Sequence, residues 1–243
     1  MDLQKFQYRS AIALNNWGVE LLARGHFAQA RQTIRGAVAL LKVAAEESNQ
    51  AKFQDVDCDT IESQLQRAAR LLSSPHRTPG ARRIVHVLSH DCTSWEHEVA
   101  NLMKSNPSLL IALRIEKPDY ADVTDLDVDL VTACVVYNCG ISYACLASLA
   151  RKESTGEAIK MRTTAAKVIA RACQLVALAS TQLDGVFVAI VLFTSLERLL
   201  PGTGEELVSQ AKEFTDRLQE LRKVAAIYNS TTSELIEHPS AAA

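Results

Sequence analysis

Apolar residues of alternating size recur at helical spacing near the N-terminus of this 243-residue chain. Leu14, Trp17 and Leu21 follow one another at intervals of three and four residues, which places them on one face of a helix. Gly18 lies within that face, where a missing side chain lets a second helix approach closely. Gly25 comes where the first helix would end, a position that favours a left-handed residue. This pattern predicts two helices packed as an antiparallel hairpin.

Eight positions of the predicted hairpin, which spans residues 8–24 and 27–47, match a known repeat. The segment resembles the tetratricopeptide repeat (TPR), a 34-residue helix–turn–helix unit. The proline that usually closes the repeat is absent, and Lys42 or a neighbour stands in its place. An ordinary helical hairpin of an unrelated bundle is the alternative. The matching positions are Leu14, Gly18, Leu21, Gly25, Phe27, Ala30, Ile34 and Ala37.

A second, longer copy of the pattern occurs in the C-terminal half. Residues 137–143 mirror residues 15–21, with Gly140 in the place of the close-packing glycine. Ala165 follows Gly140 after 25 residues, whereas the corresponding step in the first hairpin takes twelve. We expect the additional residues at a turn near 151–156, with both helices lengthened. The second copy therefore resembles the repeat more loosely than the first.

The region between the two copies has a different character. Serine, proline and glycine in residues 73–80 predict a linker. Residues 83–88 and 108–115 are rich in β-branched and aliphatic side chains, and they predict two strands that pair antiparallel around a short helix at Trp95–Met103. Two strands alone are marginally stable, so we expect this β-hairpin insertion to pack against the helices.

These patterns predict an all-α fold of TPR-like antiparallel hairpins in a superhelical stack, with the small β-hairpin-containing insertion. The predicted segments are an N-terminal hairpin plus one helix (1–72), a linker and insertion (73–123), long helical hairpins (124–236) and a frayed tail (237–243). The further predicted helices are 55–72, 125–151, 156–180, 183–199 and 204–228.

Two groups of polar residues could carry chemistry in this chain. A cluster in residues 86–97 offers metal-ligand side chains, but the first His-x3-His pair spans a predicted strand and turn instead of one helix face. Asp125, Asp127 and Asp129 have the first spacings of a calcium loop, yet its glycine and closing glutamate are missing. We therefore expect no metal, no cofactor and no catalytic residue. The cluster consists of His86, His90, Asp91, Cys92, Glu96 and His97.

Composition and charge restrict the kinds of partner and the cellular compartment that we expect for this protein. The net charge is −2 and no basic run occurs, so nucleic acid is not expected as a partner. The start lacks the apolar segment of a signal peptide, and the apolar run Val186–Phe193 is too short to span a membrane. The six cysteines form no CxxC pair. Together these features predict an intracellular protein, in the cytoplasm, without a membrane span.

Asn16 and Asn138 are the candidate binding residues. Each lies two residues before a close-packing glycine. The resemblance implies that this position lines the inner groove and hydrogen-bonds the backbone of a bound peptide, since a carboxamide offers a donor and an acceptor. Recognition of a terminal carboxylate is not expected, because Ile12 and Cys134 stand where that form needs basic residues. A helix–helix hydrogen bond within the stack is the alternative role for each asparagine.

The resemblance implies a non-catalytic scaffold or adaptor that binds a protein or peptide on a concave helical face. One alternative is an enzyme or metal-binding protein with its site in residues 86–97. Another is a self-associating structural subunit, a homo-oligomer in which a second copy covers the apolar residues 183–200.

Overall fold

The computed structural model describes residues 3–49, 58–73, 85–89, 109–116, 125–150, 155–179 and 183–201, and single residues between 208 and 223. The described residues are mostly α-helical, which confirms the coarse fold prediction, and they include one small sheet. The helices are α1 (Leu3–Ala23), α2 (Phe27–Asn49), α3 (Cys58–Ser73), α5 (Asp125–Ala150), α6 (Thr155–Ala179) and α7 (Leu183–Leu199). The strands are β1 (Val85–Ser89) and β2 (Leu110–Arg114).

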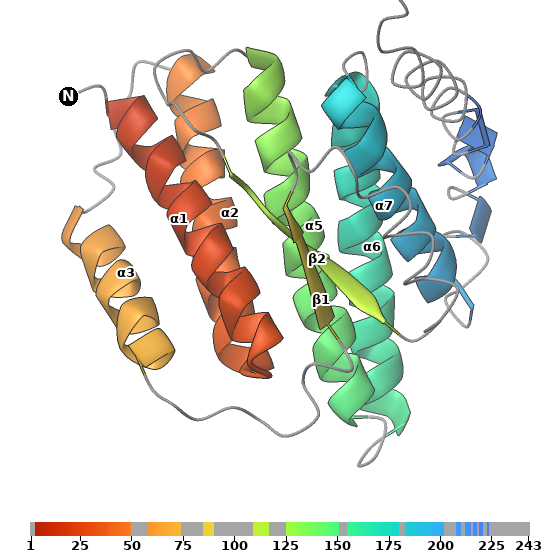
Figure 1. Cartoon of the computed structure of the whole chain (residues 1–243), viewed down its shortest axis with the longest axis horizontal. Helices are drawn as coiled ribbons and strands as arrows, with labels where there is room; N and C mark the ends of the chain where they lie inside the picture. The colour runs from red at the N-terminus through yellow and green to blue at the C-terminus, as the bar shows by residue number, and fades with distance from the viewer. Residues whose placement is uncertain are drawn as a thin grey trace, which may run out of the picture.

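Helix α1 overlies α2 and α7 overlies α6, with α5 between these two pairs and the strands in front of α5 (Figure 1). Helices α1 and α2 form the first hairpin, α5 and α6 form the second, and α2 packs against α5. Helix α3 flanks α1 at one end, and α7 packs on α6 at the other. Strand β2 touches α1, α5 and α7, so it joins the two hairpins.

The predicted helix boundaries agree with the structure to within a few residues. The largest difference is at α1, which begins at Leu3 where the sequence pattern predicts residue 8. The residues described between 208 and 223 are helical, as the prediction of a helix over 204–228 requires. The predicted linker at 73–80 and tail at 237–243 lie almost entirely outside the described residues.

The two strands pair in parallel, so the predicted β-hairpin is wrong. Val85 lies opposite Leu110, and the register continues to Ser89 opposite Arg114. An antiparallel pair needs only a short turn, whereas a parallel pair needs a connection long enough to return the chain to the starting edge. Residues 90–109 supply such a connection of twenty residues. The predicted helix at Trp95–Met103 lies within this segment and outside the described residues.

The turn of the first hairpin has the conformation that its glycine predicts. Gly25 has a φ of 84°, in the left-handed region that favours glycine. Its N–H donates to the carbonyl of Leu22 at 3.0 Å, and the N–H of His26 donates to the carbonyl of Leu21 at 2.9 Å. This pair of bonds is a Schellman motif, which satisfies the last carbonyls of α1 and starts α2 in the antiparallel direction.

Both close-packing glycines lie directly against an isoleucine of the next helix. A Cβ built on Gly18 would lie 2.3 Å from Cγ1 of Ile34, and one on Gly140 would lie 2.4 Å from Cγ1 of Ile169. Those distances are too short for any side chain, so each hairpin requires glycine for its helices to touch. The small residues Ala30 and Ala165 are also fully buried beside these contacts.

The apolar residues of α7 and α5 are packed within the chain. Val188, Leu192 and Leu196 of α7 are buried, and Phe214 stacks on Phe193 with ring centroids 5.3 Å apart. In the described part of the chain, one helix segment is long and apolar enough to cross a membrane, Val128–Ala150, and 78% of its most apolar stretch is buried inside the protein. The central helix of a folded core satisfies the same criteria, so this segment is weak grounds for a membrane span.

Candidate functional site

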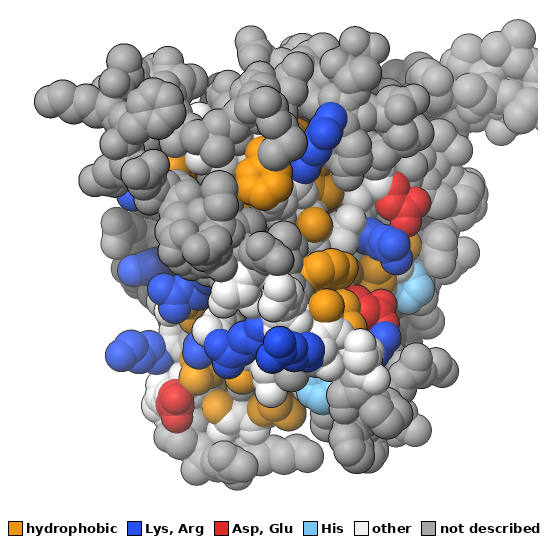
Figure 2. Space-filling view, turned by 90° about the vertical axis from the view of Figure 1, so that its left-hand side faces the viewer, with side chains coloured by type: hydrophobic (Ala, Val, Ile, Leu, Met, Phe, Trp, Pro, Cys, Tyr) orange, Lys and Arg blue, Asp and Glu red, His pale blue; other side chains and the backbone are white. Residues whose placement is uncertain are grey.

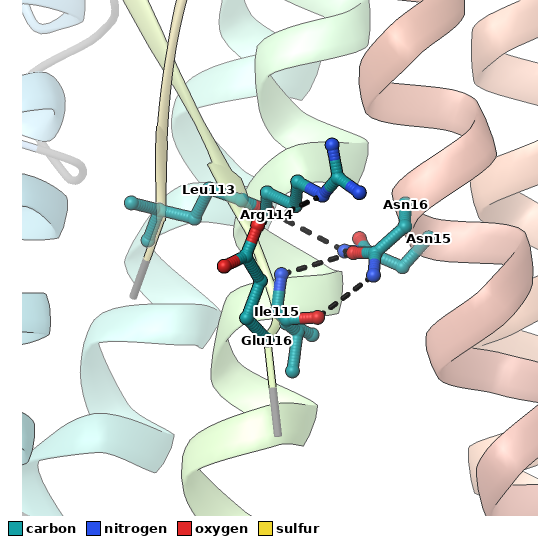
Figure 3. A network of polar contacts seen from close by, with 6 residues as sticks. All are labelled: Asn15, Asn16, Leu113, Arg114, Ile115 and Glu116. Carbon is teal, nitrogen blue, oxygen red and sulfur yellow. Dashed lines mark hydrogen bonds and ion pairs between the residues drawn. The ribbon is translucent and has the colours of Figure 1, made fainter. Parts of the chain in front are cut away.

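Asn16 binds the backbone of an extended segment through both ends of its carboxamide. Its Nδ2 donates to the carbonyl of Ile115 at 2.7 Å, and its Oδ1 accepts from the N–H of the same residue at 2.9 Å (Figure 3). The side chain projects from α1, and Ile115 directly follows β2. One asparagine thus satisfies both polar groups of one residue in an extended chain.

Asn138 of α5 makes the same pair of hydrogen bonds with Leu113, two residues before Ile115. The N–H of Leu113 donates to its Oδ1 at 2.9 Å, and its Nδ2 donates to the carbonyl of Leu113 at 2.6 Å. The same Nδ2 lies 2.9 Å from Oδ1 of Asn15, which links α5 to α1. Asn15 and Asn138 are completely buried, whereas Asn16 is half-buried. Since buried amides need partners, this network fixes the orientation of all three carboxamides.

The contacts continue along alternate residues of the strand. Tyr137 donates its hydroxyl hydrogen to the carbonyl of Ile111 at 2.7 Å, and its oxygen lies 2.8 Å from Oγ of Ser195 on α7, so that Ser195 can donate to it. Arg198 of α7 donates to the carbonyl of Leu109 at 3.4 Å. Every second residue of a strand directs its backbone N–H and C=O to the same edge, which explains why these contacts fall on residues 109, 111, 113 and 115. We call residues 109–115 together with these helix side chains the strand clamp.

The side chains of the clamped strand are buried at Ile111, Ala112 and Leu113, and burial alternates with exposure only from Leu113 to Glu116. Ile111, Leu113 and Ile115 are at most 2% exposed, and they belong to the core that the helices share. Arg114 and Glu116 point to solvent, where Arg114 Nε and Glu116 Oε1 lie 3.2 Å apart (Figure 3). Both of these side chains are about half exposed, so their ion pair contributes little to stability. The clamp holds the backbone, while apolar packing selects the side chains.

The structure therefore brings the two predicted binding residues together on a single strand. The backbone that they hold belongs to this chain, a fact that no pattern in the sequence indicates. Asn138 also makes a helix–helix hydrogen bond, the alternative role considered for it. Sequence reasoning missed Asn15, Tyr137 and Ser195 as members of the network. Two of these could have been found, because Asn15 and Tyr137 occupy equivalent positions in the two mirrored segments.

The alternative metal cluster is mostly outside the described residues. His86 lies in β1 and is half-buried, and the other five members of the cluster fall in undescribed positions. Across the described ranges, no group of three or more His, Cys, Asp or Glu side chains could hold a metal ion. Asp125, Asp127 and Asp129 lie at the start of α5, where negative charge suits the helix dipole.

Four cysteines of the second hairpin are buried free thiols. Burial raises the pKa of Cys134 to about 12, and it raises the pKa of Cys139 to about 11 against a smaller opposing effect of Arg35 and Arg31. The pKa values of Cys145 and Cys173 are also raised by burial. Because the thiolate is the nucleophile, these four groups are poor candidates for nucleophilic catalysis at neutral pH.

Comparison with protein-family models, curated proteins and solved structures finds no match for this chain. The strand clamp is therefore interpreted from its own geometry.

Proposed function

We propose that this protein is a non-catalytic interaction scaffold, built from TPR-like hairpins whose inner helices form a concave, peptide-holding face. One observation carries the proposal: equivalent asparagines of two hairpins bind successive alternate residues of one extended segment. The asparagines recognise main chain, and the buried side chains of the held segment supply the apolar selectivity. In the described structure β2 occupies the face, so a partner segment binds by replacing β2.

The free energy needed to displace β2 determines which partner segments can bind. Withdrawing Ile111, Leu113 and Ile115 exposes three buried side chains, each worth roughly 1.5–3 kcal/mol. The backbone groups of Leu113 and Ile115 would also lose their carboxamide partners. A partner segment must recover this free energy, so we expect large apolar side chains at alternate positions of an extended peptide. Such a segment would bind Asn16 and Asn138 on one edge and β1 on the other.

A peptide with the sequence of residues 108–116, labelled and extended by lysines for solubility, tests the proposal. Proline at Ala112 should loosen the native strand: the alternation directs this residue's N–H toward β1, and proline lacks that donor. We expect the folded A112P variant to capture the peptide more rapidly and more tightly than the wild type does, in fluorescence anisotropy.

Two controls separate capture by the clamp from nonspecific binding. Adding N16A and N138A to A112P should abolish capture, and a peptide of the same composition with its alternation broken should not bind. A folded A112P protein that ignores the native peptide would contradict the proposed function. A capture that survives loss of both asparagines would place the binding elsewhere.

A further inference from the structure

A second candidate site lies away from the strand clamp, between α2 and α3. An open groove of about 740 Å³ runs along residues 28–36 of α2 and residues 63–68 of α3. Among the described side chains, ten line it, and these include three arginines and no aspartate or glutamate. We call this feature the arginine groove. The lining residues are Ala28, Gln29, Arg31, Gln32, Thr33, Arg35, Gly36, Ser63, Arg67 and Ala68.

The three arginines leave their positive charge available to a ligand. In the described parts of the chain, no carboxylate forms an ion pair with Arg31, Arg35 or Arg67. Arg35 and Arg67 are exposed, and Arg31 is half-buried with its guanidinium 5.4 Å from the ring centroid of Tyr143. That cation–π contact fixes one side of Arg31 without neutralising it. Figure 2 shows Lys and Arg side chains in a row across this side of the molecule.

The rest of the lining also suits an anion with several oxygens. Gln29, Gln32 and Ser63 supply neutral donors, and the two alanines and the glycine leave room beside them. The Thr33 hydroxyl donates to the carbonyl of Gln29 at 2.9 Å instead. Guanidinium groups bind phosphate in a forked, two-bond geometry, and the charged lining side chains that the structure describes are all arginine instead of lysine. Because the net charge of the chain is −2, this local excess of positive charge does not reflect a basic protein.

We propose that the arginine groove binds a phosphorylated segment of a partner protein. The groove is open, and it extends over more than two helical turns of α2, which suits a chain passing through it better than one small ion. This site is lined by residues of α2 and α3 and includes neither β2 nor the clamp side chains, so it goes beyond the proposed exchange of β2. Phosphate recognition here requires no movement of the strand.

A labelled peptide of four phosphoserines separated by glycines is the probe, compared with the same peptide without phosphate. We expect the phosphopeptide to bind the full chain in fluorescence anisotropy, and the unphosphorylated peptide to bind about tenfold more weakly or worse. The variant R31Q/R35Q/R67Q should lose about tenfold in affinity for the phosphopeptide. Should that variant fail to fold, R35Q/R67Q changes only exposed side chains and keeps the test decisive.

The matched control is K160Q/K167Q/R171Q, which removes the same charge from exposed positions of α6. We expect its affinity to stay within about twofold of the wild type at equal salt. Equal losses in both triple variants would overturn the proposal, because net charge alone would then explain binding. Equal affinity for sodium tripolyphosphate or for a single-stranded oligonucleotide would also overturn it, assigning the groove to a free polyanion or to nucleic acid. Absence of binding at millimolar phosphopeptide would overturn it as well.

Discussion

The hairpins α1–α2 and α5–α6 differ in length and surroundings but share their decisive contacts. In each, a glycine of the first helix lies against an isoleucine of the second, and an asparagine two residues earlier holds the backbone of the extended segment 109–115. The second hairpin takes thirteen more residues than the first to pass from glycine to isoleucine. The extra length lies at the turn end, where it leaves both contacts intact. The spacing between the asparagine and the glycine is the same in both hairpins, whereas the number of residues between the glycine and the turn differs.

The surroundings decide how much each contact matters. The second hairpin lies between α2 and α7, and Asn138 is completely buried. The first hairpin has only α3 beyond it among the described helices, and Asn16 is half-buried. Because buried polar groups cost more to leave unpaired, equivalent substitutions should destabilise the second hairpin more than the first.

The largest effects are expected at the glycine–isoleucine contacts. I169A should lower the free energy of unfolding by about 2–5 kcal/mol through the cavity it leaves, and G140A by about 1–3 kcal/mol through overpacking. In the double variant the new methyl group enters the space that Ile169 vacates, so the loss should be smaller than the sum. Urea denaturation measures the three values.

The first hairpin offers the matched cycle, G18A with I34A. The coupling should have the same sign there, since Gly18 also lies against Cγ1 of its isoleucine. Strictly additive losses in either hairpin would contradict the proposed role of these glycines.

Removing the carboxamides is expected to have the next largest effect. N138A leaves the N–H and carbonyl of Leu113 without a strong partner in the interior, at a cost of about 2–4 kcal/mol. N16A should cost about 1 kcal/mol, because Asn16 is only half-buried and water can reach the space that its carboxamide leaves. The aspartate variants keep the acceptor and lose the donor, so they report on each half of the contact. Equal losses for N16A and N138A would refute the expected difference between the hairpins.

The two turns should respond in opposite ways to alanine. G25A forces a methyl group into the left-handed region and should cost about 1–2 kcal/mol. Gly156, in the first turn of α6, has no neighbour within 4 Å of a built Cβ, so G156A should be neutral or stabilise by up to about 1 kcal/mol. Thermal unfolding distinguishes the two signs, and destabilisation by G156A would show that the second turn is also constrained.

The smallest effect is an alkaline loss of stability that comes from the second hairpin. Burial raises the pKa of Cys134 from 9.0 to about 12, so the unfolded chain loses this proton before the folded one does. Stability is complete below pH 9 and falls as pH rises toward 12, and at pH 9.5 the loss should be below about 1 kcal/mol. C134A should show a smaller loss than the wild type between pH 8 and 9.5, measured by urea unfolding. An unchanged slope would contradict the assigned cause.

The sequence predicts the helices well because their apolar periodicity and glycine positions are local signals. Gly18, Gly25 and Gly140 all lie where the spacing predicts close packing or a turn. The parallel pairing of the strands was missed, because the composition of a strand does not indicate its direction. The connection between the two strands determines whether they pair in parallel or antiparallel. The sequence also did not predict that residues 109–115 would be the segment bound by the asparagines. Leu113 and Ile115 bind Asn138 and Asn16 through backbone groups only, and every residue type carries the same backbone groups.

Amide hydrogen exchange at Leu113 and Ile115, followed by NMR, tests the strand clamp most directly. Both N–H groups should be strongly protected in the wild type, because each donates to an asparagine Oδ1 at 2.9 Å. N138A should remove protection at Leu113 much more than at Ile115, and N16A should do the reverse. Rapid exchange at both amides in the wild type, or protection that neither substitution changes, would contradict a clamp formed by equivalent asparagines of the two hairpins.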